Sequence, residues 1–134
     1  MERSMQDEDF LHREPTEEMR FYIAVAKGDV DSVRKNCQEQ RFLDSTGVGT
    51  LSKDPLQNIK YHFVISTAMV TRYCAECGME FEKAFRLSDF YILKLDDLHT
   101  VQEVAGLHDQ MVMDFVRQMK TLNQRSVLSR PIND

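Results

Sequence analysis

The chain has 134 residues, of which 42% are hydrophobic and 29% charged, and its formal net charge at neutral pH is −5. This length suits a single domain that buries a core without a disulfide or a metal ion, and no apolar run reaches the length of a membrane span. Residues 1–18 carry seven acidic and two basic side chains, whereas residues 19–134 carry fifteen of each, so the body lacks the basic face that nucleic-acid binding requires.

The first residues, MERSMQDEDF, contain neither the basic nor the apolar region of a signal peptide. We therefore expect a cytoplasmic protein without membrane contacts, in which the three cysteines are free thiols. Residues 1–15 should form a mobile acidic leader, and order should begin at Pro15 and Thr16. Helical periodicity dominates the rest, which predicts an all-α fold of five to six helices in one domain over residues 16–123.

The first two helices should form a hairpin. Apolar residues recur at a spacing of three and four up to Ala26, and Gly28-Asp29 then supplies a left-handed stop followed by a new N-cap. A second short helix should carry an apolar stripe that ends at Cys37. The following residues 41–53, RFLDSTGVGTLSK, are expected to be a connection that can include a short extended piece.

A long central helix is predicted from Pro55 to about Cys77, because Asp54 is a good N-cap and proline suits the first helical position. Gly78 should end this helix. Its buried stripe is expected to contain Ser66 or Thr67 at the middle step, together with Leu56, Ile59, Phe63, Val70, Cys74 and Cys77.

The last part of the chain should contain a broken helix and then a long one. Residues 80–98 are predicted to form two helical pieces with a break near Ser88. Thr100 and Glu103 have the spacing of a capping box, so the last helix should run from Val101 to Leu122. Residues 124–134 are expected to be a linker.

The Cys74-Ala-Glu-Cys77 sequence raises the question of a metal clip or a redox pair. Structural zinc needs four ligands, and neither the histidines nor Cys37 supplies a second close pair. A redox pair is activated at the N-terminus of a helix, whereas this pair lies at a predicted C-terminus. We therefore expect two packing thiols, no metal and no cofactor. Without a phosphate loop or a nucleophile motif, we also expect no catalytic residue and no enzyme activity.

Four phrases in order resemble the helical N-terminal domain of AraC-type transcriptional regulators of Gram-positive bacteria: AKGDVDSVRK, LSKDPLQNIKYHFVI, TRYCAECGMEFEKAFRLSDFYILKL and LHTVQEVAGLHDQMVMDFVRQM. The matching residues include Gly28-Asp29, Asp54-Pro55-Leu56 with Asn58, Thr71-Arg72 with Gly78, and Leu87-Ser88-Asp89 with Tyr91-Ile92. The chain departs from the family at Cys77, where a glycine often precedes Gly78. The resemblance covers about residues 17–132.

The resemblance implies a regulatory, signal-receiving or dimerisation domain whose C-terminal helix-turn-helix domain is absent from this chain. Promoter DNA would then be contacted only through that absent domain, in response to an unknown small-molecule or protein effector. Polar residues of the matched phrases could line a ligand cleft or form a structural network in which a buried Arg72 pairs with Asp89; these residues are Asn58, Lys60, Arg72, Asp89 and Tyr91.

The last helix is the expected homodimer interface, because it leads into the linker and has more apolar positions than one stripe requires. The candidate interface residues are Val104, His108, Met111, Val112, Phe115, Val116 and Met119. Neighbouring helices of the same chain could instead cover these positions. His108 should be a satisfied histidine at the core edge or interface. Two other function classes remain open, namely a stand-alone helical adaptor or dimerisation protein and a thiol-based sensor.

Overall fold

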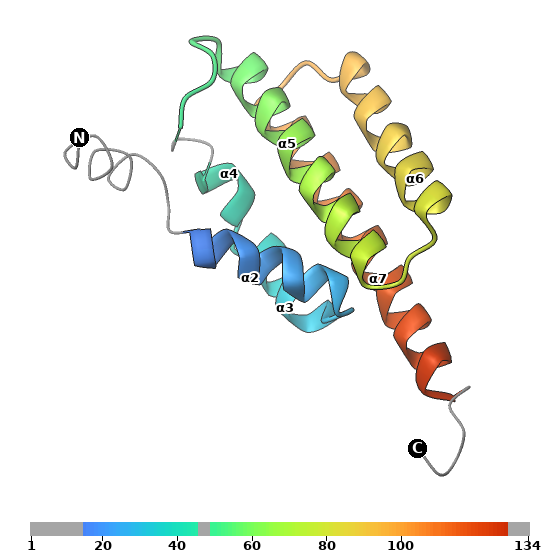
Figure 1. The fold of residues 1–134 in the computed structure, drawn as a ribbon. Helices are drawn as coiled ribbons and strands as arrows, with labels where there is room; N and C mark the ends of the chain where they lie inside the picture. Colours follow the sequence, from blue (N-terminus) through green and yellow to red (C-terminus); the bar gives the residue numbers. More distant parts are fainter. Residues whose placement is uncertain (1–14, 46–48, 129–134) are drawn as a thin grey trace, which may run out of the picture.

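The computed structural model describes residues 15–45 and 49–128. These residues form a single all-α domain, as the sequence predicted, and no β-strand occurs among them. The helices are α2 (Pro15–Ala26), α3 (Val30–Gln38), α4 (Arg41–Ser45), α5 (Pro55–Glu76), α6 (Phe81–Leu93), the 3-10 helix η1 (Lys94–Asp97) and α7 (Val101–Leu128) (Figure 1).

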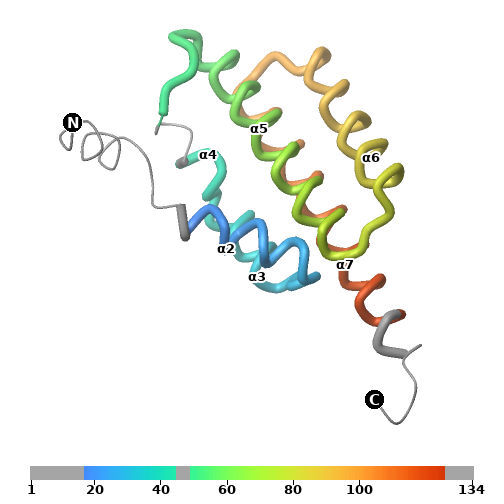
Figure 2. Tube along the Cα trace, viewed as in Figure 1, coloured from blue at the N-terminus to red at the C-terminus, as the bar shows by residue number. Residues whose placement is uncertain are grey.

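The two longest helices, α5 and α7, form the centre of the domain. They run side by side in the same direction, since Ser66 on α5 meets His108 on α7, and Gly78 just after α5 faces Leu122. Helix α6 packs along α5, and the α2–α3 hairpin lies on the opposite side of α5 and also contacts α7 (Figure 2). Helix α4 contacts α3 and α7. The largest fully buried side chains are Phe63, Phe115, Ile59, Met111 and Met119.

The predicted glycines after α2 and α5 and the predicted N-cap of α3 are confirmed. Gly28 and Gly78, which follow α2 and α5, have φ angles of +76° and +113°. Glycine adopts this left-handed conformation more easily than other residues, and it is therefore common just after the end of a helix. The Asp29 side chain accepts hydrogen bonds from the backbone N–H (3.2 Å) and the hydroxyl (2.7 Å) of Ser32, and so caps α3.

The N-termini of the two long helices also carry the predicted caps. The Asp54 carboxylate accepts a hydrogen bond from the backbone N–H of Leu56 at 3.3 Å. At α7 the Thr100 hydroxyl accepts from the Glu103 N–H, and the Glu103 carboxylate accepts from the Thr100 N–H, each at 3.1 Å. Both helices therefore begin where local side-chain chemistry satisfies free backbone donors.

Three predicted boundaries require correction. Residues 41–45 are the helix α4 rather than part of an irregular connection, because Phe42 and Leu43 pack against the core. Helix α6 passes through Ser88 without a break, since this small side chain is buried in the face of the helix; the geometry changes only at Lys94. Helix α7 extends beyond the expected end at Leu122, as far as Leu128.

The expected leader lies outside the described residues, except that Pro15 already belongs to α2. The predicted linker at residues 124–134 is helical up to Leu128, and its remaining residues lie outside the described ranges. In the α5 stripe, both Ser66 and Thr67 are buried, but Cys77 is exposed because α5 has ended before it.

Candidate functional site

The polar residues expected to line a cleft between α5 and α6 do not converge. Asn58 is buried, and its side-chain oxygen accepts hydrogen bonds from the backbone N–H groups of Leu51 (2.7 Å) and Ser52 (3.2 Å). It therefore ties the preceding segment to the start of α5. Lys60 is half-buried, and its side chain makes no hydrogen bond or ion pair with any residue that the structure describes.

The predicted buried pair between Arg72 and Asp89 is wrong. Both residues are exposed, and no ion pair joins them. The Arg72 guanidinium instead donates to the backbone carbonyl of Ala68 at 3.0 Å and lies 5.3 Å from the centre of the Phe85 ring on α6. Arg72 thus contacts α6 through an aromatic face rather than through a carboxylate.

Tyr91 belongs to a separate network that joins α6 to α7. Its hydroxyl donates to the Asp114 carboxylate at 2.6 Å, and the other oxygen of that carboxylate accepts from the Gln118 amide at 2.8 Å. Burial, followed by this contact with Asp114, raises the pKa of the Tyr91 hydroxyl. Each oxygen of the carboxylate therefore has a protein partner, and the network links α6 to α7. Tyr91 and Asp114 also line a second, open pocket together with Asp109 and Arg117.

The residues expected to form a dimer interface lie inside the chain. Each has at most 2% of its surface exposed, so none offers an apolar surface to a second copy: Val104, His108, Met111, Val112, Phe115, Val116 and Met119. Helices α2, α3, α4 and α5 of the same chain pack against α7. This corrects the assignment of the interface, since the second apolar row of α7 is required by the core.

Two of the three cysteines, Cys37 and Cys74, are poorly suited to thiolate chemistry. Cys74 is buried and Cys77 is exposed, and burial raises the pKa of the Cys74 thiol to about 12. Burial, together with the nearby Asp109 carboxylate, raises the pKa of Cys37 to about 12 as well. Within residues 15–45 and 49–128 no three His, Cys, Asp or Glu side chains come together as a metal site would require.

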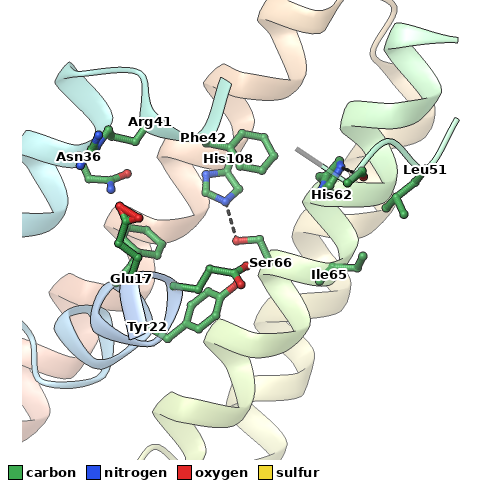
Figure 3. A pocket seen from close by; sticks show the side chains of 13 residues that line it. Glu17, Tyr22, Asn36, Arg41, Phe42, Leu51, His62, Ile65, Ser66 and His108 are labelled. Carbon is green, nitrogen blue, oxygen red and sulfur yellow. Dashed lines mark hydrogen bonds between the residues drawn. The ribbon is translucent and has the colours of Figure 1, made fainter. Parts of the chain in front are cut away.

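The most unusual polar residue of the domain is His108, of which only 2% is exposed. Figure 3 shows its imidazole beside Phe42 and directed at Ser66. Its Nε2 atom lies 2.7 Å from the Ser66 hydroxyl on α5. The Phe42 ring of α4 stacks on the imidazole with the two centroids 3.6 Å apart and the planes 2° from parallel. Phe63 makes a T-shaped contact with the imidazole, with the centroids 5.8 Å apart. The His108 ring, which α7 carries, is therefore held by side chains of α4 and α5.

The His108 imidazole is uncharged near neutral pH, because burial lowers its pKa to about 3. Its Nδ1 atom is buried and has no hydrogen-bond partner among the described residues. In either neutral tautomer one ring nitrogen serves Ser66 while Nδ1 is left as an unpaired donor or acceptor. Such a group costs about 1–3 kcal/mol when it stays unsatisfied, so it marks either a cost to stability or a position for a ligand.

His108 lines a cavity of about 350 Å³, a volume within the range of small-molecule sites. The apolar and aromatic part of the wall comes from α2, α4, α5 and the segment before α5: Phe21, Tyr22, Phe42, Leu51 and Ile65. The polar part is formed mainly by Glu17, Glu18, Asn36, Arg41, His62 and Ser66. The cavity thus combines aromatic faces with a few polar groups.

The charged residues of the cavity lie toward its edge. Glu17 and Glu18 belong to the first turn of α2, and both are exposed. Arg41 carries the opposite charge, but its guanidinium lies 3.7 Å from the carboxylate of Glu39, which is outside the lining. His62 is engaged as well, since its Nε2 atom is 3.1 Å from the Gly49 carbonyl oxygen.

The hydrogen bond between Ser66 and His108 has the length of a nucleophile–base contact, but the described residues lack other features of a catalytic pair. A catalytic histidine is normally oriented by a carboxylate at its second nitrogen, whereas Nδ1 of His108 has no partner in the described part of the chain. Its lowered pKa makes it a weak base. Ser66 lies in the middle of α5, where the backbone N–H groups are hydrogen-bonded within the helix. These groups are therefore not available to stabilise a negatively charged oxygen beside Ser66.

The sequence prediction of a satisfied histidine at the core edge or interface is wrong, because His108 is only 2% exposed and its Nδ1 atom has no partner in the described residues. The prediction also missed the contact with Ser66. A usable signal was present, because Ser66 and His108 each interrupt the apolar stripe of a long helix. Buried polar groups need partners, so two such interruptions can be expected to meet. Phe42 could not be found in this way, since a helix of five residues is too short to show a periodicity.

Comparisons with known proteins add no family to this picture. No protein-family model matches the chain, and neither a curated protein nor a solved structure is significantly similar to it. Among the described helices, none combines the length and the apolar character that crossing a membrane would require. The cavity at His108 and the ordered sequence phrases are therefore the observations that bear on function.

Proposed function

We propose that this domain is the signal-receiving module of an AraC-type bacterial transcription regulator, which controls transcription through a helix-turn-helix domain outside the described residues. The ordered phrases that resemble this family support the proposal. The structural observation that carries it is the position of His108, because this residue lines the cavity and belongs to α7. The helix that senses the cavity is thus also the last helix of the domain.

A second contact gives α7 a means of responding to the cavity. Farther along α7, about 18 Å from His108, the turn after α2 packs against the helix. Here the Asn123 amide donates to the Lys27 carbonyl at 2.9 Å, and Gly28 approaches the Lys120 backbone. The α2–α3 hairpin therefore lines the cavity and also contacts the C-terminal half of α7. A ligand that shifts the hairpin would bias the direction of α7.

The two competing classes are a stand-alone helical adaptor and a thiol sensor. A sensor thiol should be accessible and easily ionised, which the raised pKa values of Cys37 and Cys74 disfavour. An adaptor would require no ligand cavity. In the proposed regulator, two copies would act on paired DNA half-sites as a homodimer, whose interface would use surfaces other than the seven buried residues of α7.

The complete gene product tests this proposal. Its coding sequence after Asp134 should continue into two helix-turn-helix motifs, and the complete protein should alter expression of a reporter placed behind its own promoter. His108→Phe should change this regulation, whereas Gln102→Glu, an exposed change in the first turn of α7, should not. A stop codon directly after this domain, or regulation that persists unchanged when residues 15–128 are deleted, would contradict the proposal.

A further inference from the structure

We propose that the His108 cavity binds a small aromatic amine that carries a hydroxyl group on its ring, with the hydroxyl directed at His108 and the ammonium group at the acidic edge. This inference rests on the proposed function, since it names the chemical class of the signal. Three features of the cavity support it, namely its flat aromatic walls, the unsatisfied nitrogen and the distribution of charge. Each feature restricts one part of the ligand.

The aromatic ring of the ligand follows from the shape of the walls. The Phe42 ring lies parallel to the His108 imidazole at 3.6 Å, and these two flat rings form part of the cavity wall. Phe21, Tyr22 and Ile65 add further apolar surface to the same cavity. At about 350 Å³ the cavity is near the lower limit for ligand sites, so a compound with a single ring fits better than a larger one.

The hydroxyl group follows from the Nδ1 atom of His108, which is buried without a partner. Because the tautomer is set by the hydrogen bond to Ser66, Nδ1 is either a donor or an acceptor. A phenolic hydroxyl can accept or donate and therefore satisfies both cases. A ligand without such a group leaves Nδ1 unpaired, which should weaken binding by about tenfold.

The ammonium group follows from the charges around the cavity. Glu17 and Glu18 line it, and because Glu17 already has an interaction within the protein, Glu18 is the acid assigned to the ligand. The Arg41 guanidinium lies 3.7 Å from the Glu39 carboxylate. Glu18 lies close enough to Tyr22 to contribute to the raised pKa of that residue, after the larger effect of burial. This carboxylate is therefore near the aromatic wall, where it can pair with a cation. A ligand carboxylate would meet these acids and a neutral imidazole.

Three compounds of similar size separate these features. Tyramine has the ring, the hydroxyl and the ammonium group; phenethylamine lacks the hydroxyl; 4-hydroxyphenylacetate replaces the ammonium group by a carboxylate. Their affinities for the 134-residue protein can be compared by titration calorimetry. Tyramine should bind about tenfold more tightly than either of the other two. Equal or tighter binding of 4-hydroxyphenylacetate would show that Arg41 selects an acid and would overturn the proposal.

Matched variants then locate the binding site. His108→Phe keeps a flat ring against Phe42 but removes Nδ1, so it should abolish the preference for tyramine over phenethylamine. Glu18→Gln should reduce tyramine affinity severalfold without affecting the fold, because Glu18 is exposed. The control is Glu82→Gln, which changes an acid in the first turn of α6, outside the cavity, and should leave binding unchanged.

The imidazole ¹⁵N resonances of His108 provide a direct readout, and they should shift on addition of tyramine. No shift and no heat of binding at millimolar tyramine would overturn the proposed ligand class, even if the complete protein regulates its promoter. Conversely, tyramine binding that depends on His108 in a protein that does not regulate transcription would sink the proposed function and leave the ligand site intact. The two failures are therefore distinguishable.

Discussion

Gly28 fixes the junction between the α2–α3 hairpin and α7. Its φ angle is +76°, and a Cβ atom added there would lie 2.6 Å from both the Cα and the N atom of Lys120. Left-handed backbone costs a non-glycine residue about 1–2 kcal/mol, and a clash with backbone atoms cannot be relieved by rotating a side chain. We expect Gly28→Ala to lower the free energy of unfolding by at least about 2 kcal/mol, as measured by urea denaturation.

Gly106 provides the matched control for this prediction. It lies within α7, and a Cβ atom added there meets no heavy atom within 4 Å. Alanine is favoured over glycine inside a helix, so Gly106→Ala should raise the free energy of unfolding by about 0.5–1 kcal/mol. Equal effects of the two substitutions would show that the contact between Gly28 and Lys120 does not matter for stability.

His108 should make stability depend on pH. Burial lowers its pKa to about 3, whereas in the unfolded chain the pKa is near 6.5. Between these values the unfolded state binds the proton and the folded state does not, so the free energy of unfolding decreases as pH falls. The contribution is fully present above about pH 6.5 and is lost by about 1.4 kcal/mol per pH unit below it.

His108→Phe provides the test, because this variant lacks the titrating group. Urea denaturation of both proteins between pH 7 and pH 4 should show that the loss of stability is smaller in the variant. The carboxylates titrate alike in the two proteins at the lower end of this range, so their effects cancel in the comparison. Identical pH dependence would mean that His108 has the same pKa in the folded and unfolded states, in conflict with its burial.

At the scale of the element, α7 is a core helix on more than one face. Val112 and Val116 are 0% exposed, and α2, α3, α4 and α5 all contact this helix. A charge at Val112 would have no partner and no access to water. We therefore expect Val112→Glu to unfold the domain, with loss of the helical circular dichroism signal at 25 °C, rather than to give a folded protein with altered self-association.

Gln102→Glu is the control for the valine substitution. It introduces the same side chain into α7 at an exposed position in the first turn, where the helix dipole favours an acid. The thermal midpoint of this variant should stay within a few degrees of the parent. A folded Val112→Glu protein that sediments as a monomer, beside a dimeric parent, would restore the interface that the sequence predicted on α7.

For the whole molecule, the balance of charge limits what this domain can bind alone. Residues 19–134 carry fifteen acidic and fifteen basic side chains, and the excess of acids lies in residues 1–18. Neutralising several phosphates requires a surplus of Lys and Arg on one face. We expect no specific binding to DNA of the gene's own promoter at physiological salt in a gel-shift titration. Binding at micromolar concentration or tighter would contradict the division of labour proposed above.

The limits of the helices could largely be read from the sequence, because helix ends depend on neighbouring residues. Gly28 needs a left-handed backbone, Asp29 and Asp54 cap the helices that follow them, and Thr100 and Glu103 satisfy each other's backbone N–H groups. Each of these effects operates within one helical turn. The all-α fold class, the hairpin and the long helices were predictable for the same reason.

The burial of each helix face and the position of the cavity were decided by the tertiary structure. Ser66 and His108 are far apart in the sequence, and their hydrogen bond exists because α5 and α7 pack side by side. Phe42 reaches the imidazole because α4 packs against α7. No local pattern in the sequence predicts α4, so only the tertiary structure identifies this helix. Periodicity gives the apolar faces of a helix but not what covers them, so the second row of α7 was read as an interface although the chain's own core requires it.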